Sequence, residues 1–181
     1  MRGWAFRAHV VTVGLALAVP AHADKALEYA VKAAYLPKFI PFITWPDGTF
    51  ASPTAPVNIC LLGADPFGGR LDQAAGTIKA GDREIAVRHL SGPDPPTACQ
   101  LLFLGSGTDT GLAEATLQAL KGKPVVTVTD SGMNAHGVIS FVIDANHVRF
   151  DIDDAQAAQD GLVISSKLLG LAHSVRQRGR P

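Results

Sequence analysis

The sequence predicts an α/β fold: a three-layer sandwich whose central sheet is mainly parallel, with an antiparallel hairpin near the C-terminus. Short, continuously apolar runs alternate with segments whose apolar residues have helical spacing, which is typical of parallel strands covered on both faces. Two further apolar runs, 138–143 and 148–152, are separated by only a short polar segment, as in a hairpin. With 181 residues, of which 47% are hydrophobic, the chain is long enough for a substantial core.

The first predicted helix lies near the N-terminus and contains two prolines. Apolar residues recur at helical spacing from Leu27 to Phe42. Pro37 and Pro41 each lack an N–H group and clash with the preceding turn. We therefore expect a kink, or two short helical pieces that end near Trp45, and then a loop.

The middle of the chain alternates strands with helices. We expect strands at 57–62, 84–89, 101–104 and 125–129, helices at 66–75 and 110–121, and a proline-rich turn at 92–96. Gly122 and Pro124 supply the stop signal for the second of these helices. This order of elements indicates a Rossmann-like sheet. After the hairpin, we expect a short alanine-rich helix over 153–160 and a final helix, capped by Ser165 or Ser166, that extends through Val175.

The first twenty-three residues have the three parts of a secretory leader. Arg2 and Arg7 form a basic region, an apolar run over 10–19 follows, and Ala21-His22-Ala23 supplies a cleavage site. The apolar run is about half as long as a membrane span, so a cleaved leader is favoured over the alternative, a membrane anchor. Trimming before Asp24 would leave a soluble periplasmic protein.

Removing the leader, residues 1–23, leaves one domain over 24–175 and a basic, flexible tail over 176–181. The remaining 158 residues carry 14 basic and 16 acidic side chains, because both charges removed from the balanced chain are arginines. A chain without a basic excess is a poor match for nucleic acid. Outside the cytoplasm there is no ready supply of ATP or NAD(P)H, so we expect no cofactor.

The two cysteines, Cys60 and Cys99, both lie in the exported part. Cys60 falls inside one apolar strand and Cys99 directly precedes another, so the sulfurs can meet if those strands are neighbours. An even number of cysteines in an oxidising compartment favours one internal bridge. Two buried free thiols are the alternative. A catalytic thiol is disfavoured, because neither cysteine has a histidine or lysine beside it in sequence.

Two loops at strand ends form a candidate ligand cleft. Gly105 and Ser106 open a glycine-rich turn between a strand and a helix, but the third glycine comes one position too late for a dinucleotide fingerprint. A flexible turn with a capping threonine is the better interpretation. Asp130 and Ser131 follow the fourth strand, where open α/β sheets hold ligands.

No pattern in the sequence indicates catalysis or a metal site. The histidines are scattered without H-x-x-H spacing, and Ser165-Ser166-Lys167 lacks the S-x-x-K spacing of a serine–lysine pair. We therefore expect neither a metal site nor an enzyme.

Four aromatic residues are concentrated in one segment: Tyr35, Phe39, Phe42 and Trp45. Their helical spacing favours packing in the core. If the stripe is partly exposed instead, it predicts a partner-binding surface, because aromatic residues dominate interface hot spots.

Several segments, in order from Val31 to Val175, resemble the YfiR-like periplasmic family, domain of unknown function DUF4154. The matching segments are VKAAYL at 31–36 with the continuation to 46, GADPF at 63–67, VTVTD at 126–130, VRFDI at 148–152, GL at 161–162 and SSKLLGLA at 165–172. Cys99 matches a frequent second cysteine of the family. Pro37 and Pro41 depart from the family, whose first helix is usually free of proline.

The resemblance implies a small periplasmic regulator that binds the periplasmic sensory domain of an inner-membrane diguanylate cyclase. It would repress the cyclase and so lower cyclic-di-GMP signalling and biofilm formation. The resemblance also supports a disulfide between Cys60 and Cys99, and implies a homodimer. The alternative function is a periplasmic small-molecule-binding or sensor protein that holds its ligand in the cleft at the strand ends.

Overall fold

The computed structural model describes residues 21–90 and 98–179. The predicted leader, apart from its last three residues, lies outside the described residues, as does the predicted turn at 92–96. Arg180 in the predicted tail also lies outside them.

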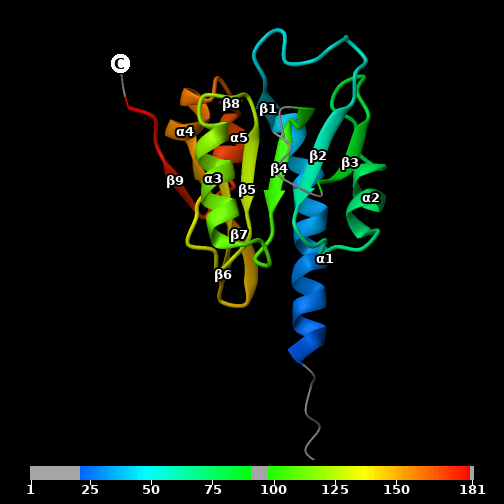
Figure 1. The fold of residues 1–181 in the computed structure, drawn as a ribbon, viewed down its shortest axis with the longest axis vertical. Helices are drawn as coiled ribbons and strands as arrows, with labels where there is room; N and C mark the ends of the chain where they lie inside the picture. Colours follow the sequence, from blue (N-terminus) through cyan, green and yellow to red (C-terminus); the bar gives the residue numbers. More distant parts are fainter. Residues whose placement is uncertain (1–20, 91–97, 180–181) are drawn as a thin grey trace, which may run out of the picture.

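A seven-stranded sheet forms the centre of the fold (Figure 1), in the order β3-β2-β4-β5-β6-β7-β9. Its strands are β2 (Val57–Leu62), β3 (Ile85–Leu90), β4 (Leu101–Leu104), β5 (Val126–Thr129), β6 (Ile139–Asp144), β7 (His147–Asp153) and β9 (Ser174–Arg176). Strands β3 through β6 pair in parallel, β6 and β7 form an antiparallel hairpin, and β9 is parallel to β7. The predicted fold class, a mainly parallel sheet with a C-terminal hairpin, is confirmed.

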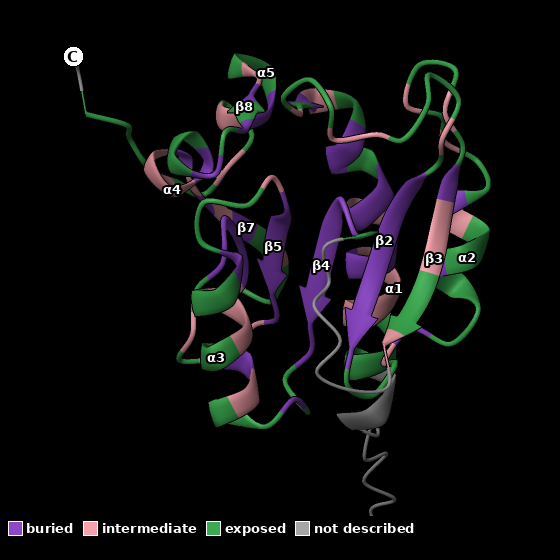
Figure 2. Ribbon diagram, turned by 45° about the horizontal axis from the view of Figure 1, so that its top comes forward, coloured by how far each residue is buried: buried purple, intermediate pink, exposed green. Residues whose placement is uncertain are grey.

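Helices pack against the sheet in two separate cores. The helices are α1 (Ala21–Phe39), α2 (Arg70–Ala75), α3 (Thr110–Leu120), α4 (Asp154–Gln159) and α5 (Ser166–Leu169). All of them except α3 contribute to the larger core, whereas α3 packs over the smaller core, which contains Cys60 and Leu102. Every residue of β2, β4 and β5 is buried (Figure 2), which explains why apolar residues predominate in β2 and β4.

The first helix is divided into two pieces as predicted, but the first piece is not short and Pro37 does not end it. Helix α1 continues through Pro37 to Phe39, and Pro41 lies in a 3-10 helix, η1 (Ile40–Phe42). The second helical piece is therefore a single turn. It leads into β1 (Ile43–Thr44), which pairs with β8 (Val163–Ile164) in a separate two-stranded antiparallel sheet. Strands of two residues are too short to produce a periodic signal, so the sequence did not predict this sheet.

The predicted final helix through Val175 is wrong. Ser165 caps α5, but this helix ends at Leu169, and the chain then forms β9 beside β7. The backbone N–H of His173 donates to the carbonyl of Phe150, at an N···O distance of 2.8 Å, and so begins this pairing. The pairing of β9 with β7 outweighs the helical spacing of the residues that follow α5.

The expected boundary between domain and basic tail at residue 176 falls inside strand β9. Arg176 forms an ion pair with Asp153 at the end of β7. Arg178 binds the buried carboxylate of Asp154 with two hydrogen bonds, each 2.6 Å long. Both arginines are therefore held by aspartates at the start of α4.

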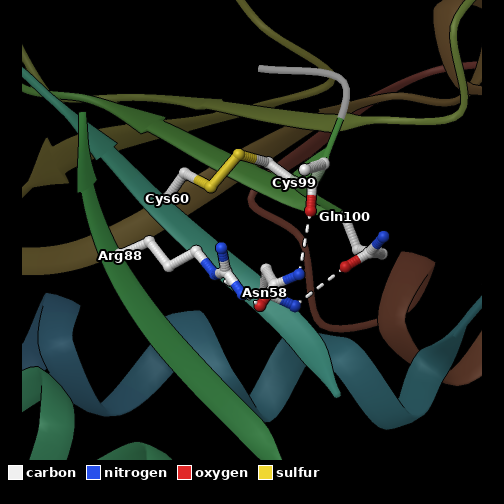
Figure 3. Close-up of a disulfide and its surroundings, with 6 residues drawn as sticks. Asn58, Cys60, Arg88, Cys99 and Gln100 are labelled. Atoms are coloured by element: carbon white, nitrogen blue, oxygen red, sulfur yellow. Dashed lines mark hydrogen bonds between the residues drawn. A yellow bond between two sulfur atoms is a disulfide. The ribbon is translucent and has the colours of Figure 1, made fainter. Parts of the chain in front are cut away.

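A disulfide between Cys60 and Cys99 joins two neighbouring strands (Figure 3), as predicted. Cys60 lies in β2 and Cys99 precedes β4, and their Cα atoms are 5.8 Å apart. Asn58 reinforces the same junction, because its backbone N–H donates to Oε1 of Gln100 at 2.8 Å. Arg88 on β3 donates to Oδ1 of Asn58 at 2.9 Å. The junction thus connects three adjacent strands.

Replacing Cys60 by serine is expected to lower the free energy of unfolding by about 4 kcal/mol, because the bridge closes a loop of about forty residues in the unfolded chain. Urea titrations with and without reductant measure this loss. Reductant should destabilise the wild type and leave the variant unchanged. Equal urea midpoints of the wild type with and without reductant would contradict the prediction.

Candidate functional site

A polar cluster with a buried ion pair at its centre lies at the carboxyl ends of β4 and β5. We call it the strand-end network; its members are Glu28, Tyr29 and Lys32 of α1, Ser106 after β4, and Asp130 and Ser131 after β5. Lys32 has none of its surface exposed, and Asp130 is 3% exposed. An ionised pair this deeply buried needs many compensating contacts.

The ammonium group of Lys32 has three oxygen partners. Its Nζ atom lies 2.5 Å from Oδ1 of Asp130 and 2.8 Å from Oγ of Ser131, and it also forms an ion pair with Glu28 one turn earlier on α1. It lies 4.9 Å from the ring centroid of Tyr29, within cation–π range. All three N–H donors of the ammonium group are therefore used.

The carboxylate of Asp130 is equally well satisfied. It accepts hydrogen bonds from the Tyr29 hydroxyl at 2.7 Å and from the backbone N–H groups of Ser106 and Ser131 at 3.2 and 2.9 Å. Burial alone would raise the pKa of Asp130, but the hydrogen bond and charge of Lys32, with the bond from Tyr29, hold it below its usual value. Burial and the neighbouring Asp130 raise the pKa of Tyr29 to about 12, so the phenol remains a neutral donor.

The neighbouring strand end, that of β2, is closed by a side chain from the β4 loop. Gly63 has φ +89°, and a Cβ atom at this position would lie 2.9 Å from Oγ1 of Thr108. The Thr108 hydroxyl donates to the carbonyl oxygen of Leu62 at 3.0 Å. Thr108 therefore closes the end of β2.

The predicted threonine cap of the following helix is wrong. Asp109 caps α3 instead, because its side chain accepts a hydrogen bond from the backbone N–H of Leu112.

The structure brings together three of the four residues predicted for a ligand cleft. Ser106, Asp130 and Ser131 converge, and Lys32 and Tyr29 of the same chain form hydrogen bonds with them. Gly105 lies beside them, close to the ring of Phe103. A cleft of ≈ 490 Å³ opens next to Asp130 and Ser131. Ligand binding at these residues stays a prediction.

Sequence reasoning missed the three residues that α1 contributes. One signal was available: Lys32 is in phase with Leu36 and Phe39 on the apolar stripe of the helix, and all three are buried. A second signal is the spacing of Glu28 and Lys32, which places opposite charges one turn apart. Neither signal indicates the third partner, because Asp130 lies 98 residues away in sequence.

The predicted aromatic stripe packs largely within the fold. Phe39 is 1% exposed and contacts the rings of Phe141 and Phe150, so it offers no surface to a partner. Tyr35 is half-buried against Phe39 and Phe150, with ring centroids 5.8 and 5.6 Å apart.

Phe42 and Trp45 are also half-buried, and Trp45 stacks edge-on against Phe50. The partner-binding role of the partly exposed members, Tyr35, Phe42 and Trp45, stays a prediction.

A comparison with protein families identifies the chain. A model of the YfiR/HmsC-like family, DUF4154, matches residues 29–173, from Tyr29 in the strand-end network to His173, directly before β9. The chain belongs to the YfiR/HmsC-like family. This family is known for periplasmic regulation of diguanylate cyclases. No curated protein matches the chain.

Within residues 21–90 and 98–179, no group of three or more histidine, cysteine or acidic side chains is arranged to hold a metal ion. Over the same ranges, no helix combines the length and apolarity needed to cross a membrane.

Replacing Lys32 by methionine is expected to lower the free energy of unfolding by about 3–5 kcal/mol, because Asp130 would be left buried without its partner. Lys25→Met, at an exposed lysine of the same helix, should change it by less than about 0.5 kcal/mol. Urea denaturation measures both. A Lys32→Met protein as stable as the control would contradict the role of the pair.

The strand-end network should also make stability depend on pH. Because the pKa of Asp130 is lower in the fold than in the unfolded chain, its contribution is present above about pH 4 and is lost as the pH falls further. The urea midpoint of the wild type should therefore fall more steeply on acidification than that of Asp130→Asn. Parallel profiles for the two proteins would argue against this linkage.

Proposed function

We propose that this protein is a periplasmic regulatory binding protein that represses an inner-membrane diguanylate cyclase. It would bind the periplasmic sensory domain of the cyclase, and so lower cyclic-di-GMP signalling and biofilm formation. The observation that carries this proposal is the family match, which extends over residues 29–173 and so includes the second half of α1 and every strand of the central sheet except β9.

The strand-end network supports a binding role without catalysis. The carboxyl ends of parallel strands are where open α/β sheets usually hold substrates. Here Lys32 and Asp130 satisfy each other at that position, and Thr108 closes the neighbouring strand end. The protein would therefore act through an outer surface of a firmly held domain.

Repression would follow from differential affinity. A domain that binds one conformation of the sensory domain more tightly than another shifts the population of the cyclase toward the bound conformation. The disulfide and the strand-end network both limit internal movement, which reduces the ordering cost of binding. Reduction of the Cys60–Cys99 bridge would loosen β2 and β4 and release the partner.

One observation favours a second candidate, a small-molecule sensor. The cleft of ≈ 490 Å³ beside the strand-end network is lined by polar groups of Asp130, Ser131 and His136 and by the apolar side chains of Phe141 and Ile143. Its volume suits a small metabolite. Calorimetry with periplasmic metabolites distinguishes this candidate from a protein that binds only the cyclase.

Deleting the gene is expected to raise cellular cyclic-di-GMP and surface attachment, because the cyclase would lose its repressor. Complementation with the full chain should restore both, whereas a version that lacks residues 1–23 should not, because it would stay in the cytoplasm. Mass spectrometry of the nucleotide and a crystal-violet attachment assay give the readouts. Unchanged cyclic-di-GMP in the deletion strain would refute the proposed function.

A further inference from the structure

The last strand of the sheet, β9, is attached to the domain mainly by polar contacts. It has three residues, Ser174–Arg176, and forms the edge of the sheet beside β7 (Figure 1). Over residues 173–179 no side chain is buried, and only Val175 is partly covered. Burial of apolar surface therefore contributes little to the attachment of this strand, in contrast to the central strands.

Three pairs between a basic side chain and an aspartate hold this C-terminal segment. The pairs are His173–Asp151, Arg176–Asp153 and Arg178–Asp154. The three basic side chains are 43–65% exposed, so dissolved salt can screen the pairs. Within the part of the chain that the structure describes, none of the three carboxylates forms a salt bridge with a second basic side chain.

Strand β7 does not depend on β9 for its own place in the sheet. It pairs with β6 over six residue pairs, whereas only three residue pairs join it to β9. Phe150 and Ile152 also anchor β7 in the larger core. If β9 detached, β7 would therefore stay in place with one edge open. The backbone N–H and C=O groups of such an edge are a template for another strand.

The open edge of β7 would carry a defined pattern of negative charge. Asp151 and Asp153 are two residues apart on the strand and so point to the same side. Asp154 follows at the start of α4 and is only 2% exposed. A buried carboxylate without a partner is unfavourable. A replacement strand would therefore need basic side chains at the spacing of the chain's own tail, at its first, fourth and sixth positions.

We propose that the edge of β7 is a docking site for an extended, basic segment of a partner protein, and that β9 competes with this segment for the edge. The partner would bind by strand addition, in which backbone hydrogen bonds provide affinity and the aspartates provide specificity. Because β9 must detach first, the apparent affinity is reduced by the fraction of molecules in which the edge is open. This site is separate from the proposed repression of a cyclase and does not depend on it.

Hydrogen exchange tests whether charge holds β9. Raising sodium chloride from about 0.05 M to about 0.5 M should lower the protection of the amides that join β9 to β7 by about tenfold, because the salt screens the three pairs. The amide of His173, which donates to Phe150, is one of them. The amides that join β6 to β7 serve as the internal control and should keep their protection.

A peptide tests the docking site directly. The probe is a fluorescein-labelled peptide with the sequence of residues 172–179, AHSVRQRG, and binding is followed by fluorescence anisotropy. The double variant Arg176→Glu/Arg178→Glu should bind it at least about tenfold more tightly than the wild type, because the aspartates repel the altered tail and leave the edge open. A control peptide in which both arginines are replaced by glutamate should bind to neither protein.

Two further variants locate the bound peptide. Adding Asp153→Lys to the double variant should abolish binding of the basic peptide, because the edge loses an acidic partner. Adding Asp144→Lys instead, at an exposed aspartate in the β6–β7 hairpin, should leave binding unchanged. Circular dichroism checks that each variant is folded.

Several outcomes would overturn the proposal. These are protection of β9 that is indifferent to salt, a double variant that does not bind the basic peptide, and equal binding of the basic and acidic peptides. A wild-type dimer that dissociates when the peptide is added would assign the edge to the tail of a second copy and would also overturn it. None of these outcomes bears on cyclase repression, which the deletion experiment tests separately.

Discussion

The buried ion pair between Lys32 and Asp130 is the interaction on which the arrangement of the fold depends. It joins the first helix to the end of the fourth parallel strand of the sheet, across 98 residues of sequence. If α1 slipped by one turn, Lys32 and Asp130 would be separated, and each charge that stayed buried without its partner would cost several kcal/mol. Apolar side chains of similar shape could hold the helix as tightly as the ion pair does. We therefore attribute a different role to the ion pair: it selects one position of α1 on the sheet over other positions.

The disulfide and the strand-end network lie on opposite faces of the sheet, and each holds a different part of the domain together. The Cys60–Cys99 bridge lies in the smaller core under α3 and ties β2 to the start of β4. The strand-end network lies on the α1 side and ties the helix to the ends of β4 and β5. Both constraints meet at β4, so the centre of the sheet is fixed at both of its ends. The surface that α1 offers outward is consequently held by covalent, ionic and aromatic contacts behind it.

The sequence predicts the centre of this fold well and its edges poorly, for physical reasons. Strands such as β2 and β4 are buried on both faces, so each appears as a predominantly apolar run that can be recognised without knowledge of its partner strand. The segment after α5 has the local spacing of a helix, but its pairing with β7 depends on residues far away in sequence. Similarly, the topology rule for parallel sheets located Asp130 and Ser131, whereas Lys32 was missed because lysine is rarely buried.

The distribution of long-range contacts has a consequence for how such a chain is made. The first helix is anchored by Asp130, and the outermost strand of the sheet, β9, is supplied by residues 174–176. The N-terminal segment therefore cannot complete its packing until most of the polypeptide has emerged, and contacts so distant in sequence form slowly. The proposed export through a narrow channel would require an unfolded polypeptide, and a topology that joins its beginning to its end would keep the nascent protein in that threadable state until secretion is nearly complete.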